Sequence, residues 1–269
     1  MERPTKNAER RTRTPLPVDA RVTRLRNAVI SGNQIADAMI SRAMRDRSPV
    51  VRATAAELIA REKKASFLGS LHEMLSDASG LVRGEVIEAL GVIEEGSGRH
   101  HEDLISRLHD VKPLVRIAAV ESLARLQDLR AIPGITSCLQ DQDSLVRAYA
   151  AIALAELGGS TCLPSSSNAL AAEGDETAAA GFLVAMRLLG DETKFAALLA
   201  LLSSSGYRVR CFVANWLPRL KLARKELGAA RMAVEEALSH PLGCADASTM
   251  SSALERLEGN IDNRGPEGT

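Results

Sequence analysis

Apolar residues recur along most of the chain in two alternating sets, each at helical spacing. One set begins at the residue before an Arg, as Val82, Val86 and Leu90 do around Arg83, and the other precedes an Asp, as in residues 67–75. Side chains three or four residues apart share one face of a helix. The pattern therefore predicts amphipathic helix pairs, the two helices of each pair being joined by a short turn.

The turn inside each pair carries a repeated motif in which an Asp is followed six residues later by an Arg. The clear copies are Asp46–Arg52, Asp77–Arg83, Asp110–Arg116 and Asp141–Arg147. Their arginines lie 31, 33 and 31 residues apart, which predicts further copies near residues 179 and 210. Both are present in degraded form. The fifth copy has Glu173 and Ala179 in the Asp and Arg positions, and the sixth has Ser204 and Arg210.

Each Arg of the motif lies about 40° from the centre of the apolar stripe of its helix, at 100° per residue. A cation there is partly buried and needs a carboxylate, which the Asp of its own turn or of a neighbouring repeat can supply. We therefore expect structural roles for Asp46, Arg52, Asp77, Arg83, Asp110, Arg116, Asp141, Arg147 and Arg210. Ser48, Ser79 and Asp143 stand where the second helices need an N-cap.

These features resemble the HEAT-repeat family, in the short variant found in bacterial proteins and bilin lyases. The resemblance covers roughly residues 33–220 and rests on the Asp-to-Arg spacing, the Val before the Arg and the Leu-Gly ending of several repeats. It implies an all-α fold, a right-handed α-solenoid of about six helix pairs with capping helices. It also implies that the second helices line a concave face, where such proteins usually bind their partners.

The two ends of the chain and the fifth repeat differ from the regular pattern. The fifth repeat has no Arg in the motif position and contains the Ser-rich run 165–167, so we expect its ladder contact to be missing and the repeat to be the weakest part of the stack. Asp19 is the expected N-cap of a first capping helix. The predicted order is a disordered basic arm (1–18), a cap helix (19–32), the solenoid (33–220), capping helices (221–259) and a disordered tail (260–269).

Composition indicates the kind of core and the cellular surroundings. Of the 269 residues 45% are apolar but 3% are aromatic, so small aliphatic side chains must form the core, which suits closely packed helices. The net charge of zero argues against a whole-molecule polyanion binder and leaves room for a local patch. The four cysteines lack C-x-x-C spacing and indicate buried, reduced thiols. No apolar run is long enough for a membrane span or a secretory signal, so we expect a cytoplasmic protein, and the resemblance implies a bacterial one.

The position five residues after each Arg lies opposite the apolar stripe and should face the concave side. Its occupants are Glu57, Glu88, Glu121, Ile152, Val184 and Asn215. The three carboxylates would form an acidic row that, with Tyr149 and Phe212 as aromatic anchors, receives a basic protein segment. The alternative is a solvated helix face, because Glu57–Arg61 and Glu121–Arg125 have the spacing of favourable i,i+4 pairs.

A basic cluster follows the last repeat. It consists of Arg208, Arg219, Lys221, Arg224 and Lys225, with Arg231 further on. We interpret it as a charged end cap, although with the N-terminal arm it could form a patch for nucleic acid or an acidic partner.

Two His-Glu pairs, at residues 72–73 and 101–102, invite comparison with deoxyhypusine hydroxylase, a HEAT-repeat di-iron enzyme whose His-Glu pairs open second helices. Here the matching position after Arg83 is Gly84-Glu85, and both His-Glu pairs lie in first helices. We therefore expect that they cannot converge on a metal ion.

Other enzyme classes find little support in the residues. HEAT-like alkylpurine DNA glycosylases need a basic concave groove with aromatic residues, whereas this chain has Glu at three such positions and Trp216 at a flanking one. No Ser-His-Asp or Cys-His arrangement, Gly-rich phosphate loop or paired-carboxylate site stands out. We expect no catalytic residues, no metal and no cofactor.

The sequence thus predicts a non-catalytic adaptor or regulator that binds a protein partner through its concave face, as a monomer or within a hetero-complex. Two alternatives stay open. One is a nucleic-acid-associated solenoid that uses the basic arm and the C-terminal basic cluster, and the other is a bilin-lyase-type enzyme subunit.

Overall fold

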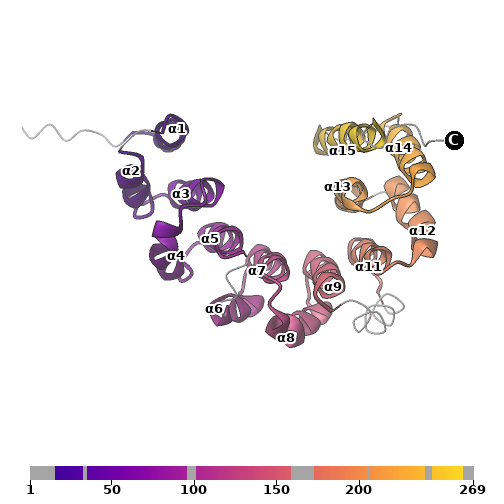
Figure 1. The fold of residues 1–269 in the computed structure, drawn as a ribbon, viewed down its shortest axis with the longest axis horizontal. Coiled ribbons are helices and arrows are strands. Elements are labelled where there is room, and N and C mark those ends of the chain that lie inside the picture. Colours follow the sequence, from indigo (N-terminus) through magenta and orange to yellow (C-terminus); the bar gives the residue numbers. More distant parts are fainter. Residues whose placement is uncertain are drawn as a thin grey trace, which may run out of the picture.

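The helices form a two-layered horseshoe (Figure 1). A computed structural model describes residues 16–32, 35–95, 101–158, 173–204, 206–239 and 244–262, and every regular element in these ranges is helical. The predicted all-α solenoid of stacked helix pairs is confirmed. None of the described helices combines the length and the apolar character that a membrane crossing requires.

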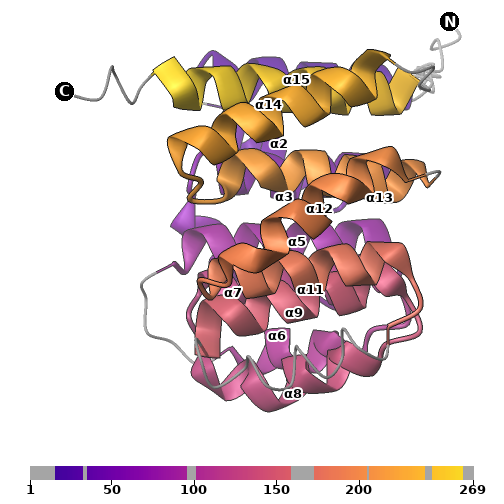
Figure 2. The ribbon, with the colours of Figure 1, turned by 90° about the vertical axis from the view of Figure 1, so that its right-hand side faces the viewer.

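The second helices of the pairs form the inner, concave layer, and Figure 2 shows them stacked one on the next. This layer contains α3 (Pro49–Arg61), α5 (Gly80–Ile93), α7 (Pro113–Arg125), α9 (Ser144–Gly158), α11 (Glu176–Leu188) and α13 (Tyr207–Trp216). At its ends α1 (Val18–Ile30) packs on α3, and α15 (Cys244–Asp262) packs on α13.

The first helices are shorter and form the outer layer (Figure 1). They are α2 (Ala36–Ala43), α4 (Leu68–Met74), α6 (Glu102–Ser106), α8 (Ile132–Ser137), α12 (Phe195–Ala200) and α14 (Arg224–Ser239). Several continue into a 3-10 turn, such as Arg107–His109 after α6. Because the inner helices have neighbours on both sides and behind them, α7 is buried at every residue from 115 to 120.

An Arg of each regular second helix holds two repeats together. Arg52 donates from Nε and Nη2 to the carboxylate of Asp77 at 2.7 and 2.8 Å, and from Nη1 to the backbone carbonyl of Asp46 at 2.8 Å. The guanidinium therefore binds the carboxylate of the next repeat and the carbonyl of its own. The same arrangement recurs in Arg83–Asp110, Arg116–Asp141 and Arg147–Glu173.

Single ion pairs extend this series to both capping helices, where Arg21 of α1 donates to Asp46 and Arg210 donates to Asp246 of α15. We call the whole series the Arg–carboxylate ladder. The arginine side chains of the four bidentate pairs are 11–17% exposed. The hydrogen bonds from Arg52, together with the backbone N–H of Ser79, hold the pKa of Asp77 below its usual value.

The ladder carboxylates also organise the turns before the second helices. Ser48 and Ser79 occupy the N-cap positions as expected, but their side chains form no cap hydrogen bond within the described residues. Instead the carboxylate two residues earlier accepts the serine N–H, at 2.8 Å from Asp46 and 2.9 Å from Asp77. Asp143 does cap its helix, because it accepts the N–H groups of residues 145 and 146.

The sequence of the fifth repeat led us to expect that its ladder contact is missing. The structure shows that the contact with the preceding repeat is kept and that the contact with the following repeat is lost. Glu173 replaces Asp and still binds Arg147 in two hydrogen bonds of 2.7 and 2.9 Å, because its longer side chain reaches the same guanidinium. The missing contact is the outgoing one, since Ala179 stands in the Arg position. There Glu176 accepts a hydrogen bond from Ser204 of the next turn. The Ser-rich run 165–167 lies outside the described residues.

The capping helices differ from the expected boundaries by a few residues. α1 begins at Val18 with Pro17 at its N-cap, so Asp19 lies in the first turn rather than at the cap. α15 continues to Asp262, past the boundary expected at residue 259. The expected arm and tail otherwise lie outside the described residues, which exclude 1–15 and 263–269.

A glycine sets the closest approach in the inner layer. A Cβ added to Gly181 of α11 would lie 2.3 Å from the Cα of Ala148 of α9 and 2.7 Å from the carbonyl oxygen of Ala148. These atoms belong to the backbone and cannot rotate away. Only Gly at residue 181 therefore allows α9 and α11 to pack as they do.

Replacing Arg116 by Ala should destabilise the fold by about 3 kcal/mol, because it leaves the Asp141 carboxylate partly buried without its bidentate cation. Urea unfolding followed by circular dichroism measures the change. Arg61→Ala, which removes an exposed pair with Glu62, is the control and should cost less than about 0.5 kcal/mol. Equal destabilisation of the two variants would show that the ladder contributes no more than a surface ion pair.

Gly181→Ala should lower the free energy of unfolding by about 1–3 kcal/mol, because the added methyl group overlaps the backbone of α9. Gly84→Ala in α5 is the matched control, since nothing lies within 4 Å of its added Cβ. That control should stabilise the chain by about 0.5–1 kcal/mol through helix propensity. Thermal unfolding of both variants checks the pair, and stabilisation by both would contradict the close packing.

Candidate functional site on the concave face

A pocket of about 270 Å³ opens on the concave face between α7, α9 and the end of α13. Its polar and aromatic wall consists of Glu121, Arg125, Tyr149, Glu156, Trp216 and Arg219. The first four project from the solvent side of two adjacent inner helices. Trp216 ends α13, and Arg219 ends the 3-10 turn that follows it, Leu217–Arg219. The horseshoe brings these last two residues across from α7 and α9.

Glu121 is the most perturbed carboxyl group of the pocket. Burial raises its pKa to about 7, and the nearby charge of Glu88 acts in the same direction, while Arg125 and Arg219 lower it in part. Burial also raises the pKa of Glu156, again opposed by the same two arginines. Among the described residues, no hydrogen bond or ion pair reaches either carboxylate. The pocket thus contains two acids with raised pKa values, the partly buried Glu121 and the more exposed Glu156, and neither has a bonded cation among the described residues.

An aromatic cluster closes the pocket on the side of α13. The ring of Tyr149 meets Phe212 edge to face at 5.7 Å between centroids, and Phe212 lies 6.5 Å from Trp216. The guanidinium of Arg219 stacks 5.2 Å from the centre of the Trp216 ring. Burial raises the pKa of Tyr149 to about 12. The phenol therefore remains protonated at neutral pH.

Two of the residues predicted for the concave face are in fact covered by this cluster and by the close packing of α9 and α11. Ile152 is 2% exposed and Val184 is fully buried. Phe212, predicted as an exposed anchor, is 5% exposed and supports Tyr149 from behind. The prediction of an exposed Phe212 was wrong, because a helix wheel describes one helix at a time and does not include the neighbouring helices that cover its residues.

The remaining residues of the predicted acidic row face different partners. Glu57 accepts a hydrogen bond of 2.8 Å from Arg26 of α1 instead of pairing with Arg61, whose Nε donates to Glu62. Glu88 is exposed, and it contributes with burial to a raised pKa of Glu85 on the same helix. Glu121 and Arg125, which we expected to form an i,i+4 pair, form no ion pair within 4 Å in the described chain. The charge of Arg125 lowers the pKa of Glu121 in part.

The predicted C-terminal basic patch is divided by the structure. Arg208 lies exposed in the first turn of α13, whereas Arg219 follows the other end of that ten-residue helix and belongs to the pocket. Lys221, Arg224 and Lys225 are exposed beyond it, at the start of α14. Arg208 is therefore separated from the rest of the sequence cluster by the length of α13.

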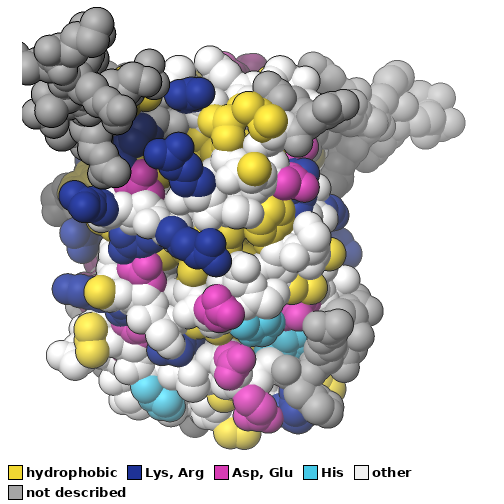
Figure 3. Space-filling view, turned by 90° about the vertical axis from the view of Figure 1, so that its left-hand side faces the viewer, with side chains coloured by type: hydrophobic (Ala, Val, Ile, Leu, Met, Phe, Trp, Pro, Cys, Tyr) yellow, Lys and Arg dark blue, Asp and Glu magenta, His cyan; other side chains and the backbone are white. Residues whose placement is uncertain are grey.

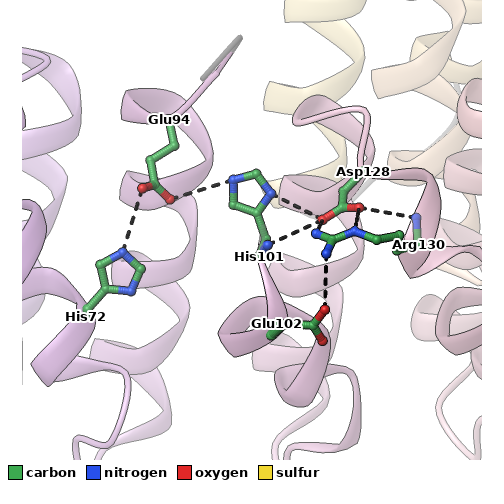
Figure 4. A network of polar contacts seen from close by, with 6 residues as sticks. All are labelled: His72, Glu94, His101, Glu102, Asp128 and Arg130. Carbon is green, nitrogen blue, oxygen red and sulfur yellow. Dashed lines mark hydrogen bonds and ion pairs between the residues drawn. The ribbon is translucent and has the colours of Figure 1, made fainter. Parts of the chain in front are cut away.

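The histidines of the two His-Glu pairs contact one shared carboxylate, a contact that their register in the sequence gave no reason to expect. Figure 4 shows Glu94, at the end of α5, between His72 of α4 and His101 before α6. Its carboxylate oxygens lie 3.7 Å from Nε2 of His72 and 3.8 Å from Nε2 of His101. On its other side His101 contacts Asp128 at 3.3 Å, and Arg130 donates to that carboxylate at 2.8 Å.

This network joins successive repeats at the edge opposite the Arg–carboxylate ladder, because it uses the ends rather than the starts of the second helices. Imidazole rings and carboxylates alternate along it. In the described residues no group of three or more His, Cys, Asp or Glu side chains is arranged to hold a metal ion. No period in the sequence would have revealed the network, since Glu94 and His101 come from different repeats.

The cysteines that the structure describes in side-chain detail are both free thiols. Cys138 is buried, and burial raises its pKa to about 11. Cys211 is partly buried and its Sγ contacts Asp246 at 3.2 Å.

Comparison with known proteins connects this geometry to a family. A family model described as HEAT repeats matches residues 36–98 and 101–176. A search of curated proteins found no match. Among solved structures, the chain is similar to one from the complex of CpcE and CpcF of phycocyanin lyase from Nostoc sp. PCC7120. That pair has a TM-score of 0.53 and 16% identity over 96% of this chain and 98% of the other.

Two further structures show weaker similarity. Human deoxyhypusine hydroxylase in complex with glycerol has a TM-score of 0.41 at 21% identity, over 91% of this chain and 92% of that one. An archaeal HEAT-like repeats protein from Thermococcus onnurineus NA1 has a TM-score of 0.34 at 19% identity, over 92% and 99%.

Glu121→Gln should stabilise the chain at pH 8 and have no effect near pH 4.5. Since the folded pKa of Glu121 is about 7 and its ordinary value is 4.5, the folded state keeps a proton that the unfolded state releases between these values. Stability therefore falls as the pH rises from 4.5 to 7, and the amide removes this decrease. We expect the melting temperature at pH 8 to rise by roughly 2–4 °C, the effect of about 1 kcal/mol.

Glu73→Gln on the exposed side of α4 is the control for this measurement and should change the melting temperature little at any pH. A shift for Glu121→Gln that is the same at pH 4.5 and pH 8 would contradict the raised pKa.

Proposed function

Because the chain belongs to the HEAT-repeat family, whose stacked helix pairs present extended concave surfaces, we propose that it is a binding scaffold. It receives a basic segment of a protein partner along the concave face, and one Lys or Arg side chain of that segment enters the pocket between α7, α9 and α13. The adaptor role, the cytoplasm as the compartment and a bacterial origin are parts of this proposal.

The observation that carries the proposal is the pair of acids that line one pocket, the partly buried Glu121 and the more exposed Glu156. Both carboxyl groups have raised pKa values, so the folded chain carries a free-energy cost for ionising them. A partner cation placed between them offsets that cost, because it lowers both pKa values in the way an internal ion pair would. The protein's own arginines at the pocket reduce the cost only in part.

The walls of the pocket suit a long cationic side chain. The aromatic faces of Tyr149 and Trp216 cover the methylene stem of a Lys or Arg, and the carboxylates receive its head group. Glu88 and Glu85 on the neighbouring α5 extend the negative charge along the concave face, where further basic residues of the same segment would lie. Such a surface discriminates against acidic segments by like-charge repulsion.

The similarity to a chain of the phycocyanin lyase complex concerns the fold and supports this proposal only in that respect. That neighbour was solved in a complex of two proteins, CpcE and CpcF. A hetero-complex is consistent with a concave scaffold that is completed by a partner. The fold likeness carries no inference about the lyase reaction.

Binding should tighten as the pH rises. A short fluorescein-labelled peptide of alternating Lys and Leu, followed by fluorescence anisotropy, serves as the probe. Because bound cation requires the ionised form of Glu121, whose pKa is about 7, we expect the dissociation constant to fall about tenfold from pH 6 to pH 8. The double substitution Glu121→Gln/Glu156→Gln should weaken binding at pH 8 and remove most of the pH dependence.

Glu62→Gln/Glu73→Gln is the matched control, with the same change of charge at exposed sites away from the pocket. It should bind the peptide like the parent chain. Equal affinities of the parent and the pocket variant at pH 8, or binding of a Glu-Leu peptide as tight as that of the Lys-Leu peptide, would refute the proposal.

A further inference from the structure

A hollow of about 860 Å³ lies on the outer side of the first repeat, between α1 and the end of α2. Its charged lining consists of Arg21, Arg42, Arg45, Arg47 and Asp46. Four cations and one carboxylate give this hollow a net charge of three positive units. Figure 3, which looks onto the N-terminal side of the solenoid, shows Lys and Arg side chains gathered over the upper part of that face.

The structure gives Arg21 a partner but leaves the other three arginines available. Arg21 binds Asp46 in the Arg–carboxylate ladder. The side chains of Arg42, Arg45 and Arg47 form no hydrogen bond or ion pair with any part of the chain that is described, and all three residues are exposed. Ala38 and Ser41, which also line the hollow, are small and leave its floor open.

The repeat architecture does not require these three arginines. They precede Arg52 by 10, 7 and 5 residues, and the same positions can be read in the other repeats. The second, third, fourth and sixth repeats have Glu73, Ser76 and Ala78; Ser106, His109 and Val111; Ser137, Gln140 and Gln142; and Ala200, Ser203 and Ser205. None of these residues is Arg or Lys.

The attraction of a helix C-terminus for a cation is worth about 0.3–1 kcal/mol and falls off within the last turn. It accounts for Arg42, which lies in the last turn of α2. It does not account for three guanidiniums gathered around one hollow.

We propose that this hollow binds the phosphate backbone of double-stranded nucleic acid. Guanidinium groups match phosphate oxygens in charge and in hydrogen-bond geometry. The sequence before α1 continues the positive charge, since residues 1–15 contain Arg3, Lys6, Arg10, Arg11 and Arg13 against Glu2 and Glu9. Arg21, which also lines the hollow, stands in the first turns of α1.

The lining favours a duplex over the other polyanions that could bind arginines. Single strands are held by bases stacked on aromatic rings, and the hollow has no aromatic side chain in its lining. An acidic protein segment would bring apolar anchors, for which the hollow offers only Ala38. Contacts confined to phosphates give binding that is independent of base sequence and sensitive to salt.

The test is the anisotropy of a fluorescein-labelled DNA duplex of about two helical turns, measured between about 50 and 200 mM salt. The parent chain should bind with a dissociation constant on the order of micromolar. The variant Arg42→Glu/Arg45→Glu/Arg47→Glu should bind at least tenfold more weakly. Its slope of log affinity against log salt should be shallower by about 0.9 for each phosphate that the variant no longer neutralises.

Lys221→Glu/Arg224→Glu/Lys225→Glu is the matched control, because it makes the same change of net charge on the C-terminal basic residues. It should bind the duplex within twofold of the parent chain, provided that circular dichroism shows both triple variants to be folded. The pocket variant Glu121→Gln/Glu156→Gln should also retain the affinity for the duplex, so that this inference and the proposed function can fail separately.

Four outcomes would overturn the inference. The first is that the parent chain shows no salt-dependent binding. The second is that the two triple variants are weakened equally, which would mean that net charge alone explains the effect. Tighter binding of a single strand of the same length would contradict the duplex. Tighter binding of a poly-glutamate peptide than of the duplex would identify an acidic protein segment as the occupant.

Discussion

The bidentate contact between an Arg of one repeat and the carboxylate of the next is the interaction on which the stack depends. The carboxylate has two tasks, since Asp77 accepts both Arg52 and the N–H of Ser79. It therefore fixes where a second helix begins and how far it lies from the previous one. A change at one ladder position alters the turn of a repeat together with its docking, which is why Glu173 retains the contact in an otherwise irregular repeat.

The curvature of the stack has a chemical consequence. Phe212 of α13 reaches Tyr149 of α9. Trp216 and Arg219 then stand over carboxyl groups of α7 and α9. A straighter stack would leave Glu121 in water with an ordinary pKa. The perturbed acid is thus a property of the superhelix rather than of any one repeat.

The sequence was sufficient for the fold because its signals are local and repeated. Helix spacing, the Asp-to-Arg motif and the inward position of Glu121 follow from one repeat at a time. Contacts between non-neighbouring helices have no such signal. The burial of Phe212, the pairing of Glu57 with Arg26 and the meeting of His72, Glu94 and His101 each depend on the curvature or on chain ends that break the period. Sequence reasoning assigned Glu121, Arg125 and Tyr149 to the concave face and missed Glu156, Trp216 and Arg219, which complete the pocket wall.

Charge is distributed over this neutral chain in a way that the net value hides. The concave face concentrates carboxylates whose burial raises their pKa values, while the outer side of the first repeat concentrates guanidiniums without internal partners among the described residues. Neither feature helps the stack to fold. Because like charges held close together destabilise a folded chain, their presence at two separate surfaces is best explained by ligands of opposite charge. One scaffold can then hold a basic segment inside the horseshoe and a polyanion outside it without competition between the two.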